Sequence, residues 1–510
     1  MGYNKIWRIL LLPVLVAAVV FLAVVSHRAE ENSCLGVRIL TEAEMSGFTE
    51  LVPQELSGCI IYENEPAAID AGLFNVYISQ NIKEDTDYKN LVGSLKISHP
   101  GYSLYFAPDE MFDDIYTAVK DNHRFRLIVD FGSGAYMEYN VIFTILPVVR
   151  LTGPLEYVSP DSENIFSGTV TVWDGSYAGT GGNVTKSSGA QWKTDDVRDS
   201  DEADETLRIS LTESGGKNMV DFMGMGREDD WVLNSLYGDD SKIREKLAAE
   251  LWNGMNDSIS NKFVQPQGEY AEVVYNGVYK GVYLLQRKAD QKHFGLDGDD
   301  LLARDKKDRR GSYTQNNYTV LDGYYTEQEA TDIIKPFHTL TDVSEVDIEN
   351  WIDAHLFSNI VCNKGRTDYT EMYYIWQNTS VGRRIRMIPI ISDSIFGMTF
   401  DKEENSYSFD ENLNVSEVVY RREYDALKGA YPDLDKKIAQ RYAEIREGVF
   451  NEKNIEVIIQ ELSAGLEASG ALLRDKPVWK EDGENTALLY EYIYARLEYL
   501  DLYYNYNQAE

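Results

Sequence analysis

The sequence predicts an α+β protein in which a β-rich N-terminal half precedes a helix-rich C-terminal part. Three observations predict this class. Apolar and polar residues alternate over 125–131, a Gly-Ser-Gly turn follows at 132–134, and a β-rich run returns over 135–146. Asn276-Gly277 stands between two further strand-like runs and predicts a tight hairpin. From residue 415 onward, apolar residues recur at helical spacing with few breakers.

The charge of the chain excludes one class of partner. Its 510 residues include 49 Lys and Arg against 84 Asp and Glu, which gives a formal net charge of −35. Such a surface repels the phosphate backbone of nucleic acids, so we expect no nucleic-acid partner. It repels anionic lipid as well, and membrane attachment therefore requires a hydrophobic segment. Three cysteines are too few for a disulfide scaffold, although a Cys34–Cys59 pair stays open.

A hydrophobic segment stands at the N-terminus. Residues 9–25 form an uncharged apolar run that follows Lys5 and Arg8. Because positively charged flanks stay in the cytoplasm, residues 1–32 predict a signal anchor or a signal peptide cut near Ser26. A signal anchor places the protein in the cell membrane as a single-pass protein with an extracytoplasmic C-terminal part. A cleaved signal peptide makes it a secreted protein.

Two folded units are expected after this segment. Residues 36–147 read as a small β-rich accessory domain with one short helix over 109–120 and no visible catalytic grouping. Residues 148–505 form the larger domain, which begins with strands at 166–175 and 207–211.

Helices within the larger domain are predicted from their caps and apolar faces. Ser241 is expected to cap one helix, and Ser344, with Asp347 three residues later, another that ends near Cys362. The first of these helices carries four apolar residues on one face: Ile243, Leu247, Leu251 and Met255. The last helix of the chain is expected to bury a stripe of five residues: Leu488, Tyr492, Ala495, Tyr499 and Leu502.

Two aspartates stand in an order that suits phosphoryl transfer. Asp368 follows a predicted helix, a hairpin over 372–377 and 384–391 comes next, and Asp393 follows within Asp-Ser-Ile-Phe-Gly. Because a hairpin returns the chain, both positions can meet. One aspartate can then orient an attacking hydroxyl while the other holds Mg²⁺ against phosphates. A purely structural role, as a turn residue and a cap, stays open from the pattern alone.

The sequence resembles the spore-coat protein H (CotH) kinase-like family over roughly 151–501. The family has an atypical protein-kinase-like fold, and its members phosphorylate Ser and Thr of proteins with ATP and a divalent metal. The resemblance therefore implies ATP with Mg or Mn as cofactors, and a surface or coat protein as substrate. The residues that carry it are Asp230-Trp231-Val232-Leu233-Asn234, Ile243-Arg244, Asn276-Gly277-Val278-Tyr279-Lys280-Gly281-Val282-Tyr283, Asp368, and Asp393 to Gly397.

The resemblance also implies roles for single residues. Asp368 matches the catalytic aspartate and Asp393 the metal-binding aspartate. Arg208 is the nearest cation to the position of the family's paired lysines, which here falls beside the acidic stretch 195–205. Gln286 stands where an acidic residue commonly follows the hairpin. Arg208 and Gln286 are thus the candidate nucleotide-binding residues.

Two functions follow from this pattern. The first is an extracytoplasmic CotH-like protein kinase that transfers phosphate from ATP to Ser or Thr of surface or coat proteins. The second is a catalytically weak or inactive kinase-fold protein that acts in surface interaction or spore-coat assembly. The loss of phosphate-binding lysines weakens the case for efficient ATP turnover, because phosphoryl transfer depends on charge stabilisation.

Overall fold

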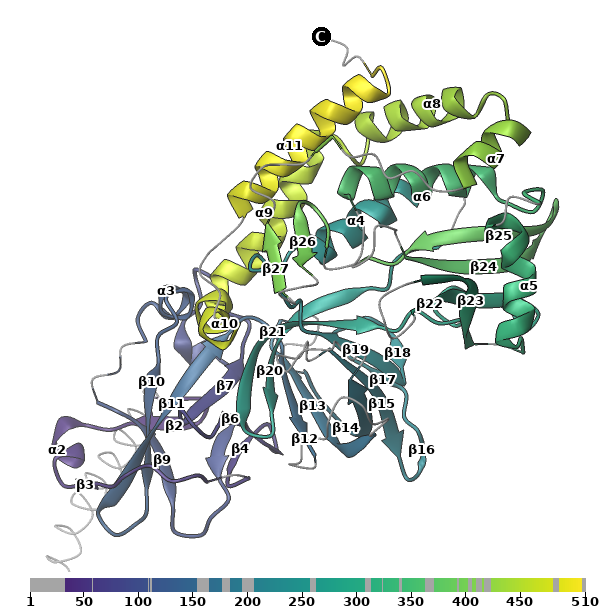
Figure 1. The fold of residues 1–510 in the computed structure, drawn as a ribbon. Coiled ribbons are helices and arrows are strands. Elements are labelled where there is room, and N and C mark those ends of the chain that lie inside the picture. The colour runs from purple at the N-terminus through teal and green to yellow at the C-terminus, as the bar shows by residue number, and fades with distance from the viewer. Residues whose placement is uncertain are drawn as a thin grey trace, which may run out of the picture.

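The structure is a computed structural model, and it divides into a β-rich unit, a barrel and a helix-rich unit (Figure 1). It describes residues 33–506 except 57, 109, 111, 154–164, 177–183, 195–205, 257–262, 308–312, 323, 339–341, 363–370, 392–393, 402–405, 410–414, 417–422 and 480–485. The apolar run 9–25 and the aspartates Asp368 and Asp393 therefore lie outside the described residues.

The N-terminal unit is built on a mixed sheet, as its strand-rich sequence predicts. Strand order is β1 (Ser33–Cys34), β2 (Val37–Ile39), β9 (Ser103–Phe106), β10 (Phe125–Asp130), β11 (Ala135–Thr144), β7 (Asn75–Ser79) and β6 (Ala68–Asp70), with β3 (Thr49–Glu50) beside β11. A second, smaller sheet contains β5 (Glu65–Pro66), β4 (Ile60–Tyr62) and β8 (Leu95–Ile97). Among its described residues, three short helices complete the unit: α2 (Glu42–Met45), η1 (Tyr88–Asn90) and α3 (Ile115–Lys120). Helix α3 begins later than the predicted 109–120, because the Asp114 side chain accepts a hydrogen bond from Thr117 N at 3.0 Å and caps it there.

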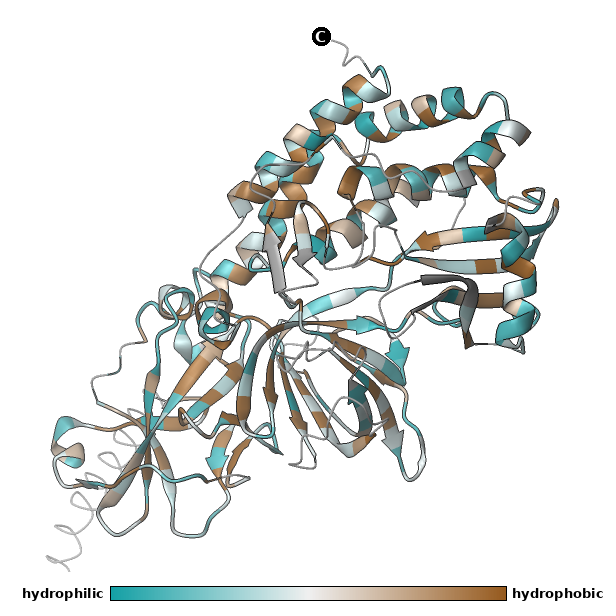
Figure 2. Ribbon diagram, in the orientation of Figure 1, coloured by the Kyte–Doolittle hydropathy of each residue, from teal (hydrophilic) through white to brown (hydrophobic). Residues whose placement is uncertain are grey.

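Seven of the described strands that follow close into a barrel. They pair in the order β14 (Val184–Thr194), β13 (Phe166–Asp174), β12 (Val148–Thr152), β20 (Gly268–Tyr275), β21 (Val278–Arg287), β19 (Asp230–Asn234) and β15 (Leu207–Glu213), and β15 pairs back to β14. Alternate residues point inward and form one apolar cluster that includes Trp192, Trp231 and Tyr283. Figure 2 shows this alternation along the strands. Short strands β16 (Gly216–Lys217), β17 (Val220–Asp221) and β18 (Arg227–Glu228) lie between β15 and β19 in sequence.

The predicted hairpin at Asn276-Gly277 is confirmed and joins β20 to β21. Asn276 has φ 48° and Gly277 has φ 76°, the left-handed pair that a two-residue turn of this type requires.

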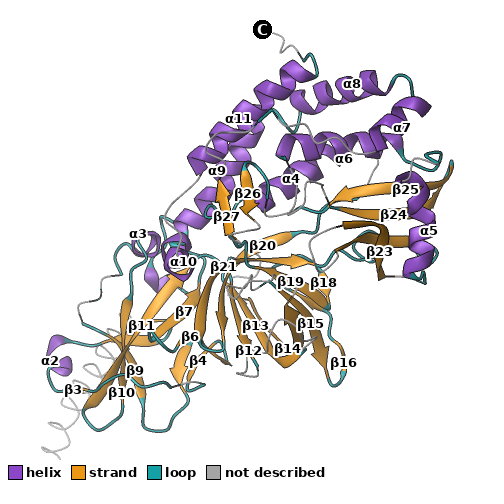
Figure 3. Ribbon diagram, in the orientation of Figure 1, coloured by secondary structure: helices purple, strands orange, loops and turns teal. Residues whose placement is uncertain are grey.

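The helix-rich unit packs around a second sheet (Figure 3). The sheet order is β23 (Tyr313–Asp322), β22 (Leu301–Lys307), β24 (Met372–Thr379) and β25 (Gly382–Pro389). Its helices are α4 (Arg244–Asn256), α5 (Glu327–His338), α6 (Ile348–Val361), α7 (Glu423–Ala430), α8 (Leu434–Glu447), α9 (Glu452–Ala468), α10 (Ala471–Trp479) and α11 (Thr486–Tyr503), with a small hairpin of β26 (Met398–Asp401) and β27 (Ser406–Phe409). The helical and hairpin predictions for this part are confirmed in type and order. All residues of α6 from Asn350 to Val361 are buried, so this helix lies at the centre of the unit.

Two helices begin later than their predicted caps. Ser241 does not cap α4, because Lys242 has φ 58° and interrupts the helical path; α4 begins at Arg244, whose amide donates to Asp239 at 2.9 Å. Ser344 does not begin α6, because Val346 forms a parallel bridge with Ile385 that keeps the chain extended up to Asp347.

The buried face of α11 also differs from the predicted stripe. The buried residues are Leu489, Tyr492, Ile493, Arg496, Leu497 and Leu500, whereas Leu502 is 76% exposed. The cause is Arg496, whose buried guanidinium donates through Nε to the carbonyl of Asn359 at 2.8 Å. A prediction that treats arginine as a surface residue therefore places the buried face of α11 about one position away from the observed face.

The N-terminal unit and the barrel share one apolar core. Val148, Trp173, Val274 and Tyr279 of the barrel belong to the same buried cluster as the strands of the N-terminal unit. Tyr77 stacks on Tyr279 with ring centroids 4.7 Å apart. The predicted boundary at 147/148 falls directly before β12, which begins at Val148.

Within the described residues, no helix is long and apolar enough to cross a membrane. Cys34, Cys59 and Cys362 are free thiols in the structure, so the pairing left open for Cys34 and Cys59 is not formed. Cys34 is buried, and this burial raises the pKa of its thiol to about 12.

Candidate functional site

Two backbone contacts hold together the flanks of the segments that contain Asp368 and Asp393. Ile390 N donates to Glu371 O at 2.8 Å, which extends the β24–β25 ladder by one step beyond Met372 and Pro389. Phe396 N donates to Val361 O, also at 2.8 Å, and so attaches the chain after Asp393 to the end of α6. The described ends of both segments therefore meet at one end of the hairpin.

The Phe-Gly pair after Asp393 forms a turn that accepts only glycine at its second position. Phe396 has φ 50° and Gly397 has φ 87°. A Cβ atom on Gly397 would stand 2.7 Å from Cδ2 of Tyr492 and 2.9 Å from Cε2 of Phe409. Left-handed backbone and close packing together explain why glycine stands here.

Helix α6 is fixed to the same hairpin by side chains at its first turn. Asn350 donates through Nδ2 to Met387 O at 3.0 Å and accepts from Met387 N at 2.6 Å. Asp347 caps the helix at Asn350 N and also accepts from Arg386 Nε at 2.7 Å. The helix, the hairpin and both flanks thus form one rigid platform.

The candidate nucleotide-binding residues lie in one row on the outside of the barrel. The strand register pairs Arg208 with Val232 and Val232 with Gln286. Directly paired residues of antiparallel strands point to the same face of a sheet. Their chain neighbours Trp231 and Leu233 point into the barrel, so the row Arg208, Val232 and Gln286 faces outward.

Helix α4 is joined to this same outer face. Glu245 on α4 accepts a hydrogen bond from Asn234 Nδ2 at 2.7 Å, and Asn234 lies two residues beyond Val232 on β19. Before the helix, Asp239 accepts from Ser241 Oγ at 2.6 Å and pairs with the buried guanidinium of Arg244. Burial opposes ionisation of Asp239, yet Arg244 and these hydrogen bonds hold its pKa below the usual range.

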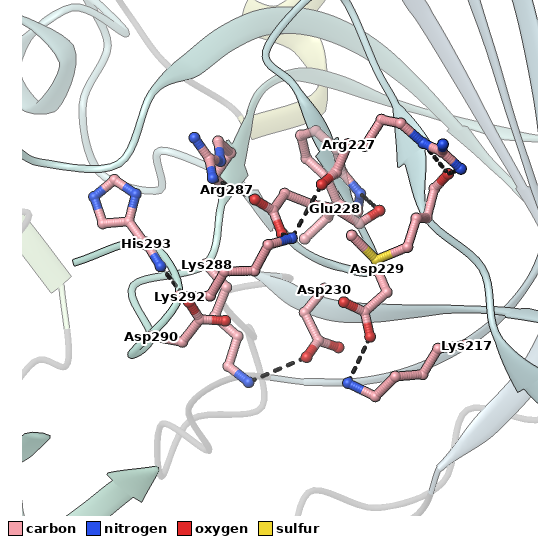
Figure 4. Close-up of polar contacts among 12 residues, drawn as sticks. Lys217, Arg227, Glu228, Asp229, Asp230, Arg287, Lys288, Asp290, Lys292 and His293 are labelled. Carbon is pink, nitrogen blue, oxygen red and sulfur yellow. Dashed lines mark hydrogen bonds and ion pairs between the residues drawn. The ribbon is translucent and has the colours of Figure 1, made fainter. Parts of the chain in front are cut away.

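A charged cluster lies where the chain leaves β21 for the second sheet (Figure 4). Glu228, only 7% exposed, pairs with both Arg287 and Lys292. Asp230 pairs with Lys288 at 3.3 Å, and the structure thereby ties β18 and β19 to the segment after β21.

Two further contacts belong to the same cluster. Asp229 pairs with Lys217 at 2.6 Å, and His293 Nε2 contacts the carbonyl of Val264 at 2.9 Å. Burial lowers the pKa of His293, which favours the neutral ring. Because carboxylates engage the cations drawn in Figure 4 beside β21, this cluster serves to hold the segment after β21 against β18 and β19.

The sequence motif that most supports the resemblance has a structural role. Tyr279 donates to Glu272 at 2.6 Å, and Glu272 pairs with Arg474 of α10 at 2.6 Å. Gly281 has φ 95°, and a Cβ atom there would collide with Asp475, whose Oδ1 accepts from Val282 N at 2.6 Å. The Tyr-x-Gly part of the motif therefore docks α10 onto the hairpin.

The structure brings some predicted site residues together and leaves others outside the described residues. Arg208 and Gln286 share a row, whereas Asp368 and Asp393 are represented only by their flanks. The Asn234–Glu245 contact was not predicted, although both residues stand in or directly after the segments that carry the resemblance. Among the described residues, no group of three or more His, Cys, Asp or Glu is arranged to hold a metal ion.

A strand-built unit, a helix packed on its outer face and a helix-rich unit with a hairpin flanked by loops make this a mixed α/β protein with a β-rich N-terminal region. Residues 200–509 match the family described as CotH kinase protein. This match covers more than half of the 510 residues, so the chain belongs to the CotH kinase family. No curated protein matches the chain. The match begins between β14 and β15, so β12, β13 and β14 complete the barrel from outside the matched part.

Proposed function

We propose that this protein is an extracytoplasmic CotH-like kinase that transfers phosphate from ATP to Ser or Thr of surface or coat proteins. The single observation that carries the proposal is the pair of contacts at the hairpin, Glu371 with Ile390 and Val361 with Phe396. They bring the flanks of Asp368 and Asp393 to one place, as phosphoryl transfer with two aspartates requires.

The residues present suit a nucleotide with a divalent metal. Arg208 offers a guanidinium, a donor set that matches phosphate oxygens, and Gln286 offers an amide that both donates and accepts. Asp393 would hold Mg²⁺ or Mn²⁺, because carboxylate oxygen is the ligand that such ions prefer. The metal would neutralise phosphate charge, and Asp368 would orient the hydroxyl of the protein substrate.

The location follows from the N-terminal segment. We propose that residues 9–25 cross the cell membrane, or direct secretion, with the large domains outside. Protease added to intact spheroplasts should then digest the large domains. Their full protection behind a sealed inner membrane would contradict this topology.

A second candidate is a kinase-fold protein with weak or no activity that acts in surface interaction or spore-coat assembly. The observation that favours it is the acidic stretch 195–205, which precedes β15 in the sequence where the family has cations. A formal charge of −35 on the whole chain adds to the cost of binding a phosphate group.

Calorimetric titration of ATP with Mg²⁺ or Mn²⁺, together with phosphate incorporation into casein, tests both candidates. Asp393→Asn should weaken metal-dependent nucleotide binding, because it removes the negative charge of the side chain that would hold the metal. Asp368→Asn should spare binding and slow transfer by about 10²–10⁴-fold, the range for groups of this kind. Asp425→Asn, on the exposed side of α7, is the matched control and should leave both unchanged.

Each result separates the candidates. Equal activity of the wild type and of both site variants would reject the assigned roles. If the folded wild type binds no nucleotide with either metal, the interaction protein is the better description.

A further inference from the structure

A cavity of about 530 Å³ lies where the three parts of the molecule meet, and neither Arg208 nor Gln286 lines it. Its wall comes from the segment between β11 and β12, the end of β13, the start of β20, and the helices α4 and α9. Six residues give it an apolar surface: Ile145, Leu146, Pro147, Met223, Tyr270 and Leu462. A volume of this size is typical of sites for small organic molecules.

One carboxylate in this cavity is deeply buried, and only one of its two oxygens accepts hydrogen bonds from described residues. Asp174, the last residue of β13, lines the cavity and is 3% exposed. Its Oδ1 accepts from Ser176 N at 2.9 Å and from Ser176 Oγ at 2.6 Å. Within the described residues no donor reaches Oδ2. Oδ2 is therefore available to a donor in the cavity, and a cationic donor there would form a charge-assisted hydrogen bond.

The other charged groups of the wall leave the cavity negative. Lys246 of α4 is occupied, because it donates to Gly268 O at 2.7 Å and pairs with Glu269 at 2.9 Å. Asp174 and Glu461 have no such counter-charge among the described residues. Burial raises the pKa of the nearby Glu250, and the charges of Glu269 and Glu461 add to this rise against Lys246.

The lining of the cavity, which combines acidic and apolar side chains, selects the chemical class of the ligand. The described carboxylates do not converge into a metal-binding group, so a single metal ion is a poor match. Apolar side chains line the same cavity, and an extended aliphatic chain with ammonium groups along it matches both features. We propose that this cavity binds a small aliphatic polyamine, with one ammonium group on Asp174 and another on Glu461.

Titration calorimetry of spermidine into the purified full-length chain, at fixed ionic strength and without nucleotide, tests the proposal. Asp174→Asn keeps the shape of the side chain and removes its charge. A charge-assisted hydrogen bond in a buried site predicts a loss of affinity of about 10-fold or more. Glu461 is exposed, so Glu461→Gln should not disturb folding, and it should give a smaller loss of affinity for spermidine. Octanediol, a neutral chain of similar shape, should not bind.

Glu467→Gln is the matched control, because Glu467 is exposed on the same helix α9 and does not line the cavity. Its affinity for spermidine should equal that of the wild type. Absence of spermidine binding by the wild type would overturn the proposal. Equal losses in Glu461→Gln and Glu467→Gln would overturn it too, because they would show that spermidine acts as a counter-ion of an acidic chain. None of these readouts depends on kinase activity.

Discussion

Single residues of the hairpin motif determine how α10 docks. Gly281 leaves room for Asp475 and for Trp479, whose Nε1 would stand 2.9 Å from a Cβ atom at this position. Lys242, fully buried, lies 3.3 Å from the other oxygen of Asp475. A side chain at position 281 would therefore disturb a buried ion pair as well as a left-handed backbone.

Gly281→Ala should lower the free energy of unfolding by about 2–4 kcal/mol, since it combines backbone strain with overpacking. Urea unfolding followed by tryptophan fluorescence measures this. Gly429→Ala is the matched control: Gly429 lies in α7 with nothing within 4 Å of its added Cβ, so alanine should stabilise slightly. Equal stability of Gly281→Ala and wild type would refute the docking role.

Glu272 makes the same docking dependent on pH. Burial opposes its ionisation, but Arg474 and the hydrogen bonds around it hold its pKa below the usual range. The folded pKa lies below the unfolded value of about 4.3, so this stabilisation is present above pH 4.3 and is lost as pH falls through the folded pKa.

Glu272→Gln should cost about 3–5 kcal/mol at pH 7, because it leaves Arg474 buried without a counter-charge. The difference from wild type should shrink as urea unfolding is repeated at lower pH, down to the acid limit of folding. Glu467→Gln, fully outside this cluster, should show neither effect. A difference that stays constant with pH would show that Glu272 does not titrate in the way proposed.

At the scale of elements, helix starts show what local patterns miss. Ser344 and Asp347 are both good caps by residue type, and the sequence alone favours the first. Tertiary pairing decides between them, because the bridge from Val346 to Ile385 leaves Asp347 as the residue at the helix start. Hairpins were easier to predict, since Asn276-Gly277 needs no distant partner.

Asp347→Ala should destabilise the protein by about 1–2 kcal/mol through loss of the cap, with a further contribution from Arg386. Ser344→Ala, at an exposed position three residues away, should stay within about 0.5 kcal/mol of wild type. Thermal unfolding of both variants compares the two positions. The reverse order of stabilities would place the cap at Ser344 after all.

At the scale of the whole molecule, the fold class and the order of elements follow from local patterns, but the barrel does not. Its closure depends on β12 beside β20 and β14 beside β15, and no local signal marks a parallel pair such as Val148 with Glu272. The candidate site, too, could be predicted only in part from the sequence. Arg208 and Gln286 were found from motif position, whereas their common row exists only through the register of β19.

The shared core predicts that the N-terminal unit and the barrel unfold together. Tyr77 stacks on Tyr279, and Asp70 Oδ2 accepts a hydrogen bond from Tyr279 N at 3.1 Å, so contacts cross the boundary in several places. Scanning calorimetry should show one transition for both units. Two separated transitions, with one assigned to residues 36–147 by limited proteolysis, would contradict this.

The closed barrel also has a consequence for synthesis on the ribosome. Val148 of β12 cannot pair with Glu272 of β20 until that residue has been synthesised, 124 positions later in the chain. At roughly 5–20 residues per second, that delay is about 6–25 s. During this interval β13 covers one edge of β12, while the other edge is open to the wrong neighbour. The time between emergence and closure is thus when a nascent chain of this protein is most exposed to mispairing.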